Sequence, residues 1–223
     1  EKIRGDGIDI LVDLSGYENW KQLEVFARKP APVQVSWLGY WNSTGLDTMD
    51  YFITDEVSSP EGSTQRFTER LVRLPGTRFC YNPPSHAPEV ALLPAQRNGY
   101  VTFGSFNKIA KLNDGVVALW SQVLKGVPGS RLLLKGKALN DEATRQWFES
   151  RFGAHGIEAD RLLLRGFSRD HRKMLEEYGD MDIALDPFPF SGALTTCEAL
   201  WMGVPTVSKG GRTLVSRQSV SLL

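Results

Sequence analysis

Two groups of polar side chains have the composition of a phosphate-binding site. Lys108 and Lys111 follow an apolar run, and a lysine in such a loop can neutralise a diphosphate as a mobile point charge. Thr195 and Thr196 open a predicted helix whose first turn has no basic residue, so its N–H groups suit an anion. Two other interpretations stay open: the lysines can be solvated loop residues, and Thr195-x-x-Glu198 by itself favours an ordinary capping box with Thr195 as N-cap.

Further loops predicted at the same sheet edge carry groups that can contact a nucleotide. Asn107 lies beside the two lysines, Gly166 follows a short apolar run, and His171 begins the next predicted helix. His171 is also typical of an ordinary surface histidine near a helix start. A nucleotide site is indicated by loops around Lys111, Gly136, Gly166 and Gly192. These loops lack the glycine spacing of a Walker or Rossmann fingerprint.

Three aspartates lie in or next to predicted strands. Asp9 lies in the apolar run 8–14, and a carboxylate inside a sheet needs a partner or becomes an acid with a shifted pKa. Asp180-x-Asp182 resembles a metal-binding acidic pair, but it enters a buried strand rather than leaving one. We therefore interpret it as a strand-boundary feature and expect no metal.

The loop 40–44 combines aromatic, amide and hydroxyl side chains, a mixture that suits a sugar. The candidate sugar or acceptor contacts in it are Tyr40, Asn42 and Thr44. The alternative is a turn that uses Asn and Gly for its backbone geometry.

A parallel sheet is needed to bring these loops together. Apolar runs predict strands at 8–14, 33–38, 49–55, 71–74, 100–106, 131–134, 161–164, 181–186 and 204–207. Helical spacing predicts helices at 18–28, 113–125, 141–152 and 170–178, and one from Thr195 that stops at Gly203. A short helix is also predicted to start at 59–61, with Pro in its first turn. Alternating strands and helices indicate an α/β protein with right-handed crossovers, which binds ligands at the carboxyl ends of its strands.

The segment 82–94 has four prolines and no periodicity, so we interpret it as a linker between two lobes, 1–93 and 94–223, with a cleft between them. The chain begins on a charged segment before a strand and ends at Ser221 to Leu223 in a predicted helix. We therefore expect a fragment that lacks part of each lobe and can be inactive alone.

Composition excludes several classes of protein. The 26 basic and 26 acidic residues cancel, so no global field attracts nucleic acid or an acidic membrane. Cys80 and Cys197 form no disulfide framework, and the three histidines lack the spacing of a zinc site. Apolar runs are too short to span a membrane. We expect a soluble, cytoplasmic protein without a nucleic-acid or membrane partner.

Several segments match one family in order over nearly the whole chain. This chain resembles the catalytic region of bacterial O-GlcNAc transferases in the segments 30–40, 44–45, 49–55, 102–107 with Lys111, and 185–205. The resemblance implies a two-lobed GT-B fold with 94–223 as the nucleotide-sugar lobe, and tetratricopeptide repeats in the full-length protein. It also implies transfer of a sugar, GlcNAc from UDP-GlcNAc, to protein Ser or Thr, with inversion and without a metal.

Residue by residue, the resemblance implies roles for the positions that match. Lys111 is similar to the lysine that contacts the donor diphosphate and stabilises the leaving group. Thr195 and Thr196 resemble the pair that binds the phosphates, and Glu198 occupies the place of an acidic residue facing the ribose. The remaining implied donor contacts are the backbone of Gly166, which reads the base, and Asn107, Lys108, His171, Gly192 and Leu194. Asp9 falls where relatives carry a histidine or aspartate considered as general base.

Departures from the family pattern affect the donor. Leu194 replaces a histidine, Lys108 replaces a glutamine, and Trp41-Asn42 replace a Pro-Gly pair. The alternatives are therefore a GDP-fucose protein O-fucosyltransferase and a UDP-glucose N-glucosyltransferase of the same family. From other classes, we consider a non-catalytic protein-binding scaffold and a GT-B-like epimerase, which the resemblance disfavours.

Overall fold

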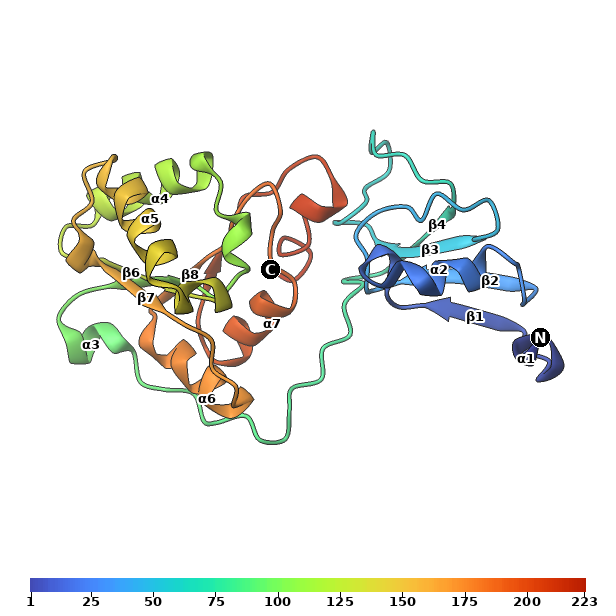
Figure 1. Ribbon diagram of the computed structural model, residues 1–223, viewed down its shortest axis with the longest axis horizontal. Coiled ribbons are helices and arrows are strands. Elements are labelled where there is room, and N and C mark those ends of the chain that lie inside the picture. Colours follow the sequence, from blue (N-terminus) through green and yellow to red (C-terminus); the bar gives the residue numbers. More distant parts are fainter. The chain divides into compact units, whose positions relative to one another are not determined.

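The chain forms two compact units. The computed structural model describes all 223 residues except the side chains of Trp20 and Lys21. Unit 1 comprises residues 1–80 and 210–222, and unit 2 comprises residues 81–209 with Leu223 (Figure 1). This differs from the expected division at 93/94 in two places: residues 81–93 group with unit 2, and residues 210–222 return to unit 1.

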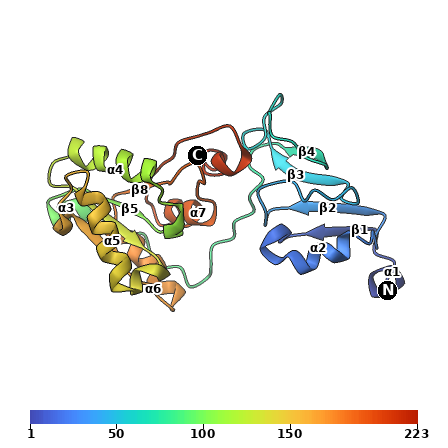
Figure 2. The same ribbon diagram turned by 45° about the horizontal axis from the view of Figure 1, so that its top comes forward.

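Unit 1 is built on a parallel sheet in the order β1-β2-β3-β4. Its strands are β1 (Ile10–Asp13), β2 (Val33–Trp37), β3 (Tyr51–Asp55) and β4 (Arg70–Leu74). The helix α2 (Trp20–Phe26) connects β1 to β2, and the short helix α1 (Lys2–Gly5) precedes β1 (Figure 2). Leu23 and Phe26 of α2 are buried, as the helical spacing predicts.

The first strand is less buried than its apolar sequence predicts. Ile10 and Leu14 are 59% and 55% exposed, because the even-numbered side chains of this segment share one largely uncovered face. Asp13 at its carboxyl end is buried and closes the predicted tight turn, since its Oδ1 accepts hydrogen bonds from the backbone N–H groups of Ser15 and Gly16, both at 3.1 Å. The Asp13 carboxylate therefore stabilises the turn that directly follows the strand.

The segment 210–222 belongs to unit 1 through polar contacts rather than through a helix. Arg217 Nε donates to the Val57 carbonyl at 2.5 Å, and Ser221 Oγ donates to Asp55 at 2.8 Å. Arg78, which is 1% exposed, donates from Nη2 to Gln218 Oε1 at 3.0 Å. The predicted helix at the end of the chain is wrong, because a single 3₁₀ turn, Leu214–Ser216, is followed by further turns.

Unit 2 is a doubly wound parallel sheet in the order β7-β6-β5-β8-β9. Its strands are β5 (Thr102–Ser105), β6 (Arg131–Lys135), β7 (Leu162–Arg165), β8 (Ile183–Leu185) and β9 (Thr206–Val207). The chain builds outward from β5 to β7 and then returns to add β8 and β9 on the other side. The order of strands therefore reverses between β5 and β8, which is the topological switch point where such sheets bind ligands.

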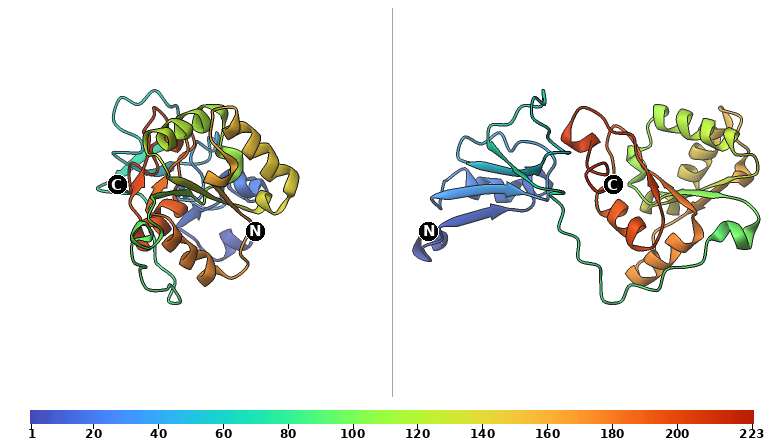
Figure 3. Two further views of the ribbon diagram at one scale, coloured as in Figure 1. Left: turned by 90° about the vertical axis from the view of Figure 1, so that its left-hand side faces the viewer. Right: turned by 180° about the vertical axis from the view of Figure 1, so that it is seen from behind.

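Helices cover both faces of this sheet (Figures 1 and 3). They are α3 (Pro94–Asn98), α4 (Asp114–Gly126), α5 (Glu142–Gly153), α6 (His171–Glu176) and α7 (Leu194–Trp201). Leu132 and Leu134 of β6 pack with Trp120 of α4, whereas Leu133 packs in a second cluster with Ala199 of α7. Successive side chains of a strand point to opposite faces, so burial on both faces explains the continuous apolar runs.

Local signals located the starts of three helices in unit 2. Asn113, Asp141 and Asp170 are the N-caps of α4, α5 and α6, and each accepts hydrogen bonds from first-turn N–H groups. The predicted helix at 59–61 is wrong, because this segment forms a turn closed by a 3.1 Å hydrogen bond from Ser63 N to the Pro60 carbonyl.

Candidate functional site

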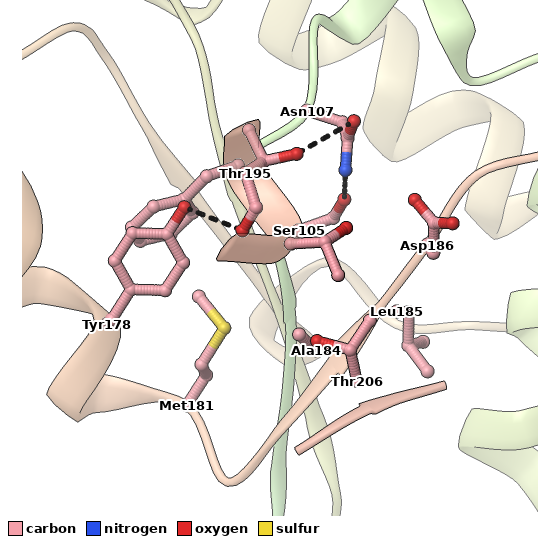
Figure 4. Close-up of a pocket in the computed structure, with 11 residues that line it drawn as sticks. Ser105, Asn107, Tyr178, Met181, Ala184, Leu185, Asp186, Thr195 and Thr206 are labelled. Atoms are coloured by element: carbon pink, nitrogen blue, oxygen red, sulfur yellow. Dashed lines mark hydrogen bonds between the residues drawn. The ribbon is translucent and has the colours of Figure 1, made fainter. Parts of the chain in front are cut away.

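Side chains from neighbouring segments of unit 2 meet at the switch point (Figure 4). They come from the end of β5 and the loop after it, from the turn before β8 and the end of β8, from the first turn of α7 and from β9. A small pocket lies there, lined by Ser105, Phe106, Asn107, Tyr178, Met181, Ala184, Leu185, Asp186, Thr195, Thr196 and Thr206. Hydroxyl, amide and carboxylate groups therefore converge at the carboxyl ends of β5 and β8, where the sequence predicts a site.

Lys111 is held at this edge by two acceptors. Its Nζ donates to the Ser191 carbonyl at 2.9 Å and to Asn107 Oδ1 at 3.2 Å, and it lies 4.0 Å from the centre of the Phe190 ring. Burial lowers the pKa of Lys111 to about 8, the nearby Asp186 carboxylate raises it, and Lys108 lowers it. The side chain is thus a positioned, partly desolvated cation rather than a solvated loop lysine.

Thr195 is not the N-cap of α7. The N-cap is Ala193, which supplies no side-chain hydrogen bond, so the predicted capping box is wrong. Thr195 Oγ1 instead donates to Asn107 Oδ1 at 3.3 Å, and Thr196 is buried in the same turn. Thr195 is therefore directed towards the β5 loop, and the first turn of α7 presents its positive dipole end there.

Glu198 and His171 form a second cluster on the same lobe. Glu198 is 5% exposed, and its Oε2 accepts a 3.0 Å hydrogen bond from the Tyr178 hydroxyl. His171 Nε2 lies 3.5 Å from Glu198 Oε1, and His86 Nε2 lies 3.1 Å from His171 Nδ1. Burial raises the pKa of Glu198, and its bonds to Tyr178 and His171 lower it. The structure thus brings His171 to a buried carboxylate, unlike an isolated surface histidine.

Gly166 lies directly against the Asn140 side chain. A Cβ at this position would lie 1.9 Å from Asn140 Oδ1, which also accepts a 3.1 Å hydrogen bond from Phe167 N. The Gly166 carbonyl accepts a 3.0 Å hydrogen bond from the buried Lys135, whose Nζ also pairs with Glu177 at 2.7 Å. The loop after β7 is therefore firmly anchored to β6.

The other predicted donor contacts differ in accessibility. Gly192 is buried and packed against the Thr pair, since a Cβ there would lie 2.6 Å from Thr196 Oγ1. Lys108 is exposed just before the 3₁₀ turn Ile109–Lys111. Leu194, the first residue of α7, is 59% exposed. An apolar side chain is thus presented beside the Thr pair.

The candidate acceptor loop in unit 1 is organised by a residue that sequence reasoning missed. Thr44 is fully buried, and its backbone N–H donates to Glu69 Oε1 at 2.7 Å, to which its hydroxyl also donates. Asn42 Oδ1 accepts from Gln65 Nε2 at 2.9 Å, and the Tyr40 ring lies 4.8 Å from that of Trp41. Thr44 therefore supports the loop, while Tyr40 and Asn42 have accessible surface.

Asp9 does not have the environment that its apolar neighbours predict. It precedes β1 at the amino end of the strand and is exposed, so the expectation of a carboxylate held inside the sheet is wrong. Its proposed role as general base stays a prediction. Asp182 behaves as a strand-boundary residue, with its two oxygens accepting from Ala95 N and Thr102 N at 2.8 Å.

The described residues contain neither a candidate metal site nor a candidate membrane span. Among them, no group of three or more His, Cys, Asp and Glu side chains is arranged to hold a metal ion. None of the helices in this part of the chain has the length and apolar character to cross a membrane.

Sequence reasoning also missed Tyr178, His86 and Asp186. Tyr178 and His86 reach the site from positions with no spacing signal, since their partners lie 20 and 85 residues away in sequence. Asp186 had a signal, because it is the first residue after a buried strand at the ligand-binding edge.

The fold and the site together define an α/β protein of the GT-B type, with its candidate donor site on one lobe. The chain belongs to glycosyl transferase family 41, whose pattern matches residues 1–87 and 92–223. The resemblance to O-GlcNAc transferases seen in the sequence is therefore confirmed.

Individual relatives agree with this assignment. A tomato protein described as a probable UDP-N-acetylglucosamine–peptide N-acetylglucosaminyltransferase SPINDLY is 44% identical over 221 residues, covering 99% of this chain and 24% of the relative. The chain thus spans about a quarter of the length of the curated relatives it matches.

Solved structures show the same fold. A mutant O-GlcNAc transferase of Thermobaculum terrenum is 41% identical with a TM-score of 0.92, covering 100% of this chain and 42% of that one. The lipopolysaccharide galactosyltransferase WaaB, at 16% identity, has a TM-score of 0.57 over 92% of this chain and 57% of its own.

Proposed function

We propose that this chain is the donor-binding part of an inverting protein glycosyltransferase that moves GlcNAc from UDP-GlcNAc to Ser or Thr. The observation that supports this most is the Lys111 ammonium beside the first turn of α7 at the switch point of unit 2. A cation and a helix N-terminus there match the charge of a nucleoside diphosphate. The names of the relatives give the donor and the peptide acceptor.

The reaction needs stabilisation of a leaving group more than covalent catalysis. The bond between the anomeric carbon and the diphosphate oxygen breaks as a bond to the acceptor hydroxyl oxygen forms, and the hydroxyl proton passes to a base. Lys111 would neutralise the charge that develops on the departing diphosphate, an effect worth a few kcal/mol at the transition state. Thr195 and Thr196 would bind the phosphates, and Glu198 with His171 would contact the nucleoside. No step in this scheme uses a metal.

The longer protein is expected to supply what this chain does not. We propose that tetratricopeptide repeats accompany the catalytic region, that proteins or peptides are the acceptors, and that the protein works in the cytoplasm. Tyr40 and Asn42 are the proposed acceptor-side contacts in unit 1, and Asp9 is the proposed base that most needs testing.

Nucleotide binding tests the proposal directly. The thermal unfolding of this chain should be measured with UDP, with GDP and without nucleotide. A ligand at a hundredfold excess over its Kd stabilises the folded state by about 2.7 kcal/mol. Stabilisation by UDP alone is expected. Stabilisation by GDP alone would instead favour a GDP-fucose donor, and an effect of neither would contradict the donor site.

Two lysine variants distinguish an enzyme from a non-catalytic scaffold. Lys111→Ala should abolish the shift with UDP, while Lys125→Ala, at an exposed position in the last turn of α4, should preserve it. In the full-length protein, the same Lys111 change should abolish transfer to a peptide. Transfer at the wild-type rate by a folded Lys111→Ala protein would contradict the proposed role of this lysine.

A further inference from the structure

Asp186 is a buried carboxylate at the centre of the site, and the proposed function gives it no role. It follows β8 at the carboxyl edge of the sheet and is 4% exposed. Its Oδ1 accepts a 2.5 Å hydrogen bond from Gly192 N, and its Oδ2 accepts a 2.6 Å hydrogen bond from Ser208 Oγ. Asp186 thereby joins the end of β8, the loop 187–193 and the segment after β9.

The hydrogen bond to Gly192 acts on Lys111 through one peptide unit. Ser191 and Gly192 are adjacent, and the Ser191 carbonyl accepts the 2.9 Å hydrogen bond from Lys111 Nζ. Fixing the N–H of Gly192 also fixes the plane of the peptide that begins with the Ser191 carbonyl, because a peptide unit is planar. The carboxylate therefore orients the acceptor that holds the lysine.

Asp186 also acts on Lys111 by charge. The charged groups that face Lys111 are Asp186, from the end of β8, and Lys108, from the loop after β5. Burial and Lys108 lower the pKa of Lys111, and Asp186 opposes both. A carboxylate next to an anion site would otherwise repel the ligand, so its benefit has to come through the lysine.

We propose that Asp186 is a positioning residue of the diphosphate site, which orients the 187–193 loop and keeps the partly buried Lys111 ammonium charged before the donor binds. This inference rests on the proposed function for the identity of the ligand, but the effect on Lys111 exists without ligand. In this proposal, the negative charge of Asp186 preserves the positive charge of Lys111.

The variant Asp186→Asn removes the negative charge of the side chain but keeps its shape. An Asn Oδ1 can accept from Gly192 N, and its amide can donate to Ser208 Oγ, so both hydrogen bonds can persist without the charge. The matched control is Asp182→Asn, four residues earlier. Asp182 is also a buried aspartate, but its carboxylate accepts from the backbone N–H groups of Ala95 and Thr102 and not from the site.

The first measurement needs no nucleotide. The protein is labelled with ¹³C at lysine Cε, the Lys111 signal is identified by its loss in Lys111→Ala, and its pH titration is followed. Asp186→Asn should move the midpoint from about 8 to lower pH, whereas Asp182→Asn should leave it in place. An unchanged midpoint in Asp186→Asn would overturn the proposal.

The second measurement is the Kd for UDP from pH 6 to 9. The affinity of Asp186→Asn should equal or exceed that of the wild type at pH 6 and fall below it by a growing factor above pH 7. A purely structural role would weaken binding by the same factor at every pH, and that result would also overturn the proposal. Failure of the wild type to bind UDP or GDP would instead contradict the proposed function, and the Lys111 titration would still decide the role of Asp186.

Discussion

His86 Nε2 lies 3.1 Å from His171 Nδ1, and the other ring nitrogen of His171 faces the buried carboxylate of Glu198 at 3.5 Å. A neutral His171 that donates to this carboxylate from Nε2 accepts through Nδ1. His86 must then donate from its own Nε2. The segment 81–93 thereby supplies a hydrogen-bond partner for a residue in the proposed nucleoside site.

Removal of His86 should weaken this arrangement by a small, measurable amount. His86→Ala deletes one hydrogen bond, worth about 0.5–1.5 kcal/mol, so we expect roughly 2- to 10-fold weaker UDP binding. The ¹⁵N shifts of the His171 ring should show a mixed tautomer in the variant. His155→Ala, at an exposed position after α5, should change neither quantity. A single unchanged tautomer in His86→Ala would disprove the coupling.

Nucleotide binding should take up protons near pH 8. The pKa of Lys111 is lowered to about 8 by burial in the free protein, and an anionic ligand raises it. The favourable interaction is therefore complete below pH 8 and is lost as pH rises above it. Calorimetry with UDP at pH 8, in two buffers of different ionisation enthalpy, should give an uptake of about half a proton per binding event. The uptake should vanish in Lys111→Ala.

Loss of the Glu69 carboxylate should destabilise unit 1. Glu69 is 5% exposed and accepts hydrogen bonds from Thr44 N at 2.7 Å and from Ser43 Oγ at 2.8 Å. Glu69→Ala leaves buried donors unpaired, each at a cost of about 1–3 kcal/mol. Urea unfolding should therefore show a lower midpoint for Glu69→Ala than for Glu61→Ala, at an exposed position. Equal midpoints would show that water replaces the carboxylate without loss.

Gly192 should tolerate no side chain. A Cβ there would lie 2.6 Å from Thr196 Oγ1 and 2.8 Å from Thr195 Oγ1, so Gly192→Ala must displace the Thr pair. We expect UDP binding to weaken by more than about tenfold, with a stability loss of about 1–3 kcal/mol from overpacking. Gly126→Ala in α4 is the matched control, because a Cβ there meets nothing within 4 Å. Binding of UDP by Gly192→Ala with wild-type affinity would contradict this geometry.

Much of the fold follows from local patterns in the sequence. Apolar runs located the strands of unit 2, and Asn113, Asp141 and Asp170 located the starts of α4, α5 and α6. These signals are reliable because a cap or an amphipathic period depends on atoms a few residues apart. The alternation of strands and helices then predicted an α/β protein and the edge at which Asn107, Lys111 and the Thr pair meet.

Local patterns could not decide between two roles for the same residues. Thr195-x-x-Glu198 matches a capping box, yet Thr195 donates to Asn107, 88 positions earlier, and Glu198 accepts from Tyr178. Likewise, Lys111 is held by the Ser191 carbonyl, 80 positions later. These partners are adjacent only because β5 and β8 are neighbours in the sheet.

The sequence by itself determined the strands, most of the longer helices, the family and the residue types of the candidate site. Only the tertiary structure decided that Asp9 is exposed, that Thr44 is buried against Glu69, and that Asp186 accepts from Gly192 N next to the Ser191 carbonyl that holds Lys111. It also decided that residues 210–222 return to unit 1. The physical reason is that burial and charge environment depend on strand order and on contacts across long stretches of chain, which no short-range spacing encodes.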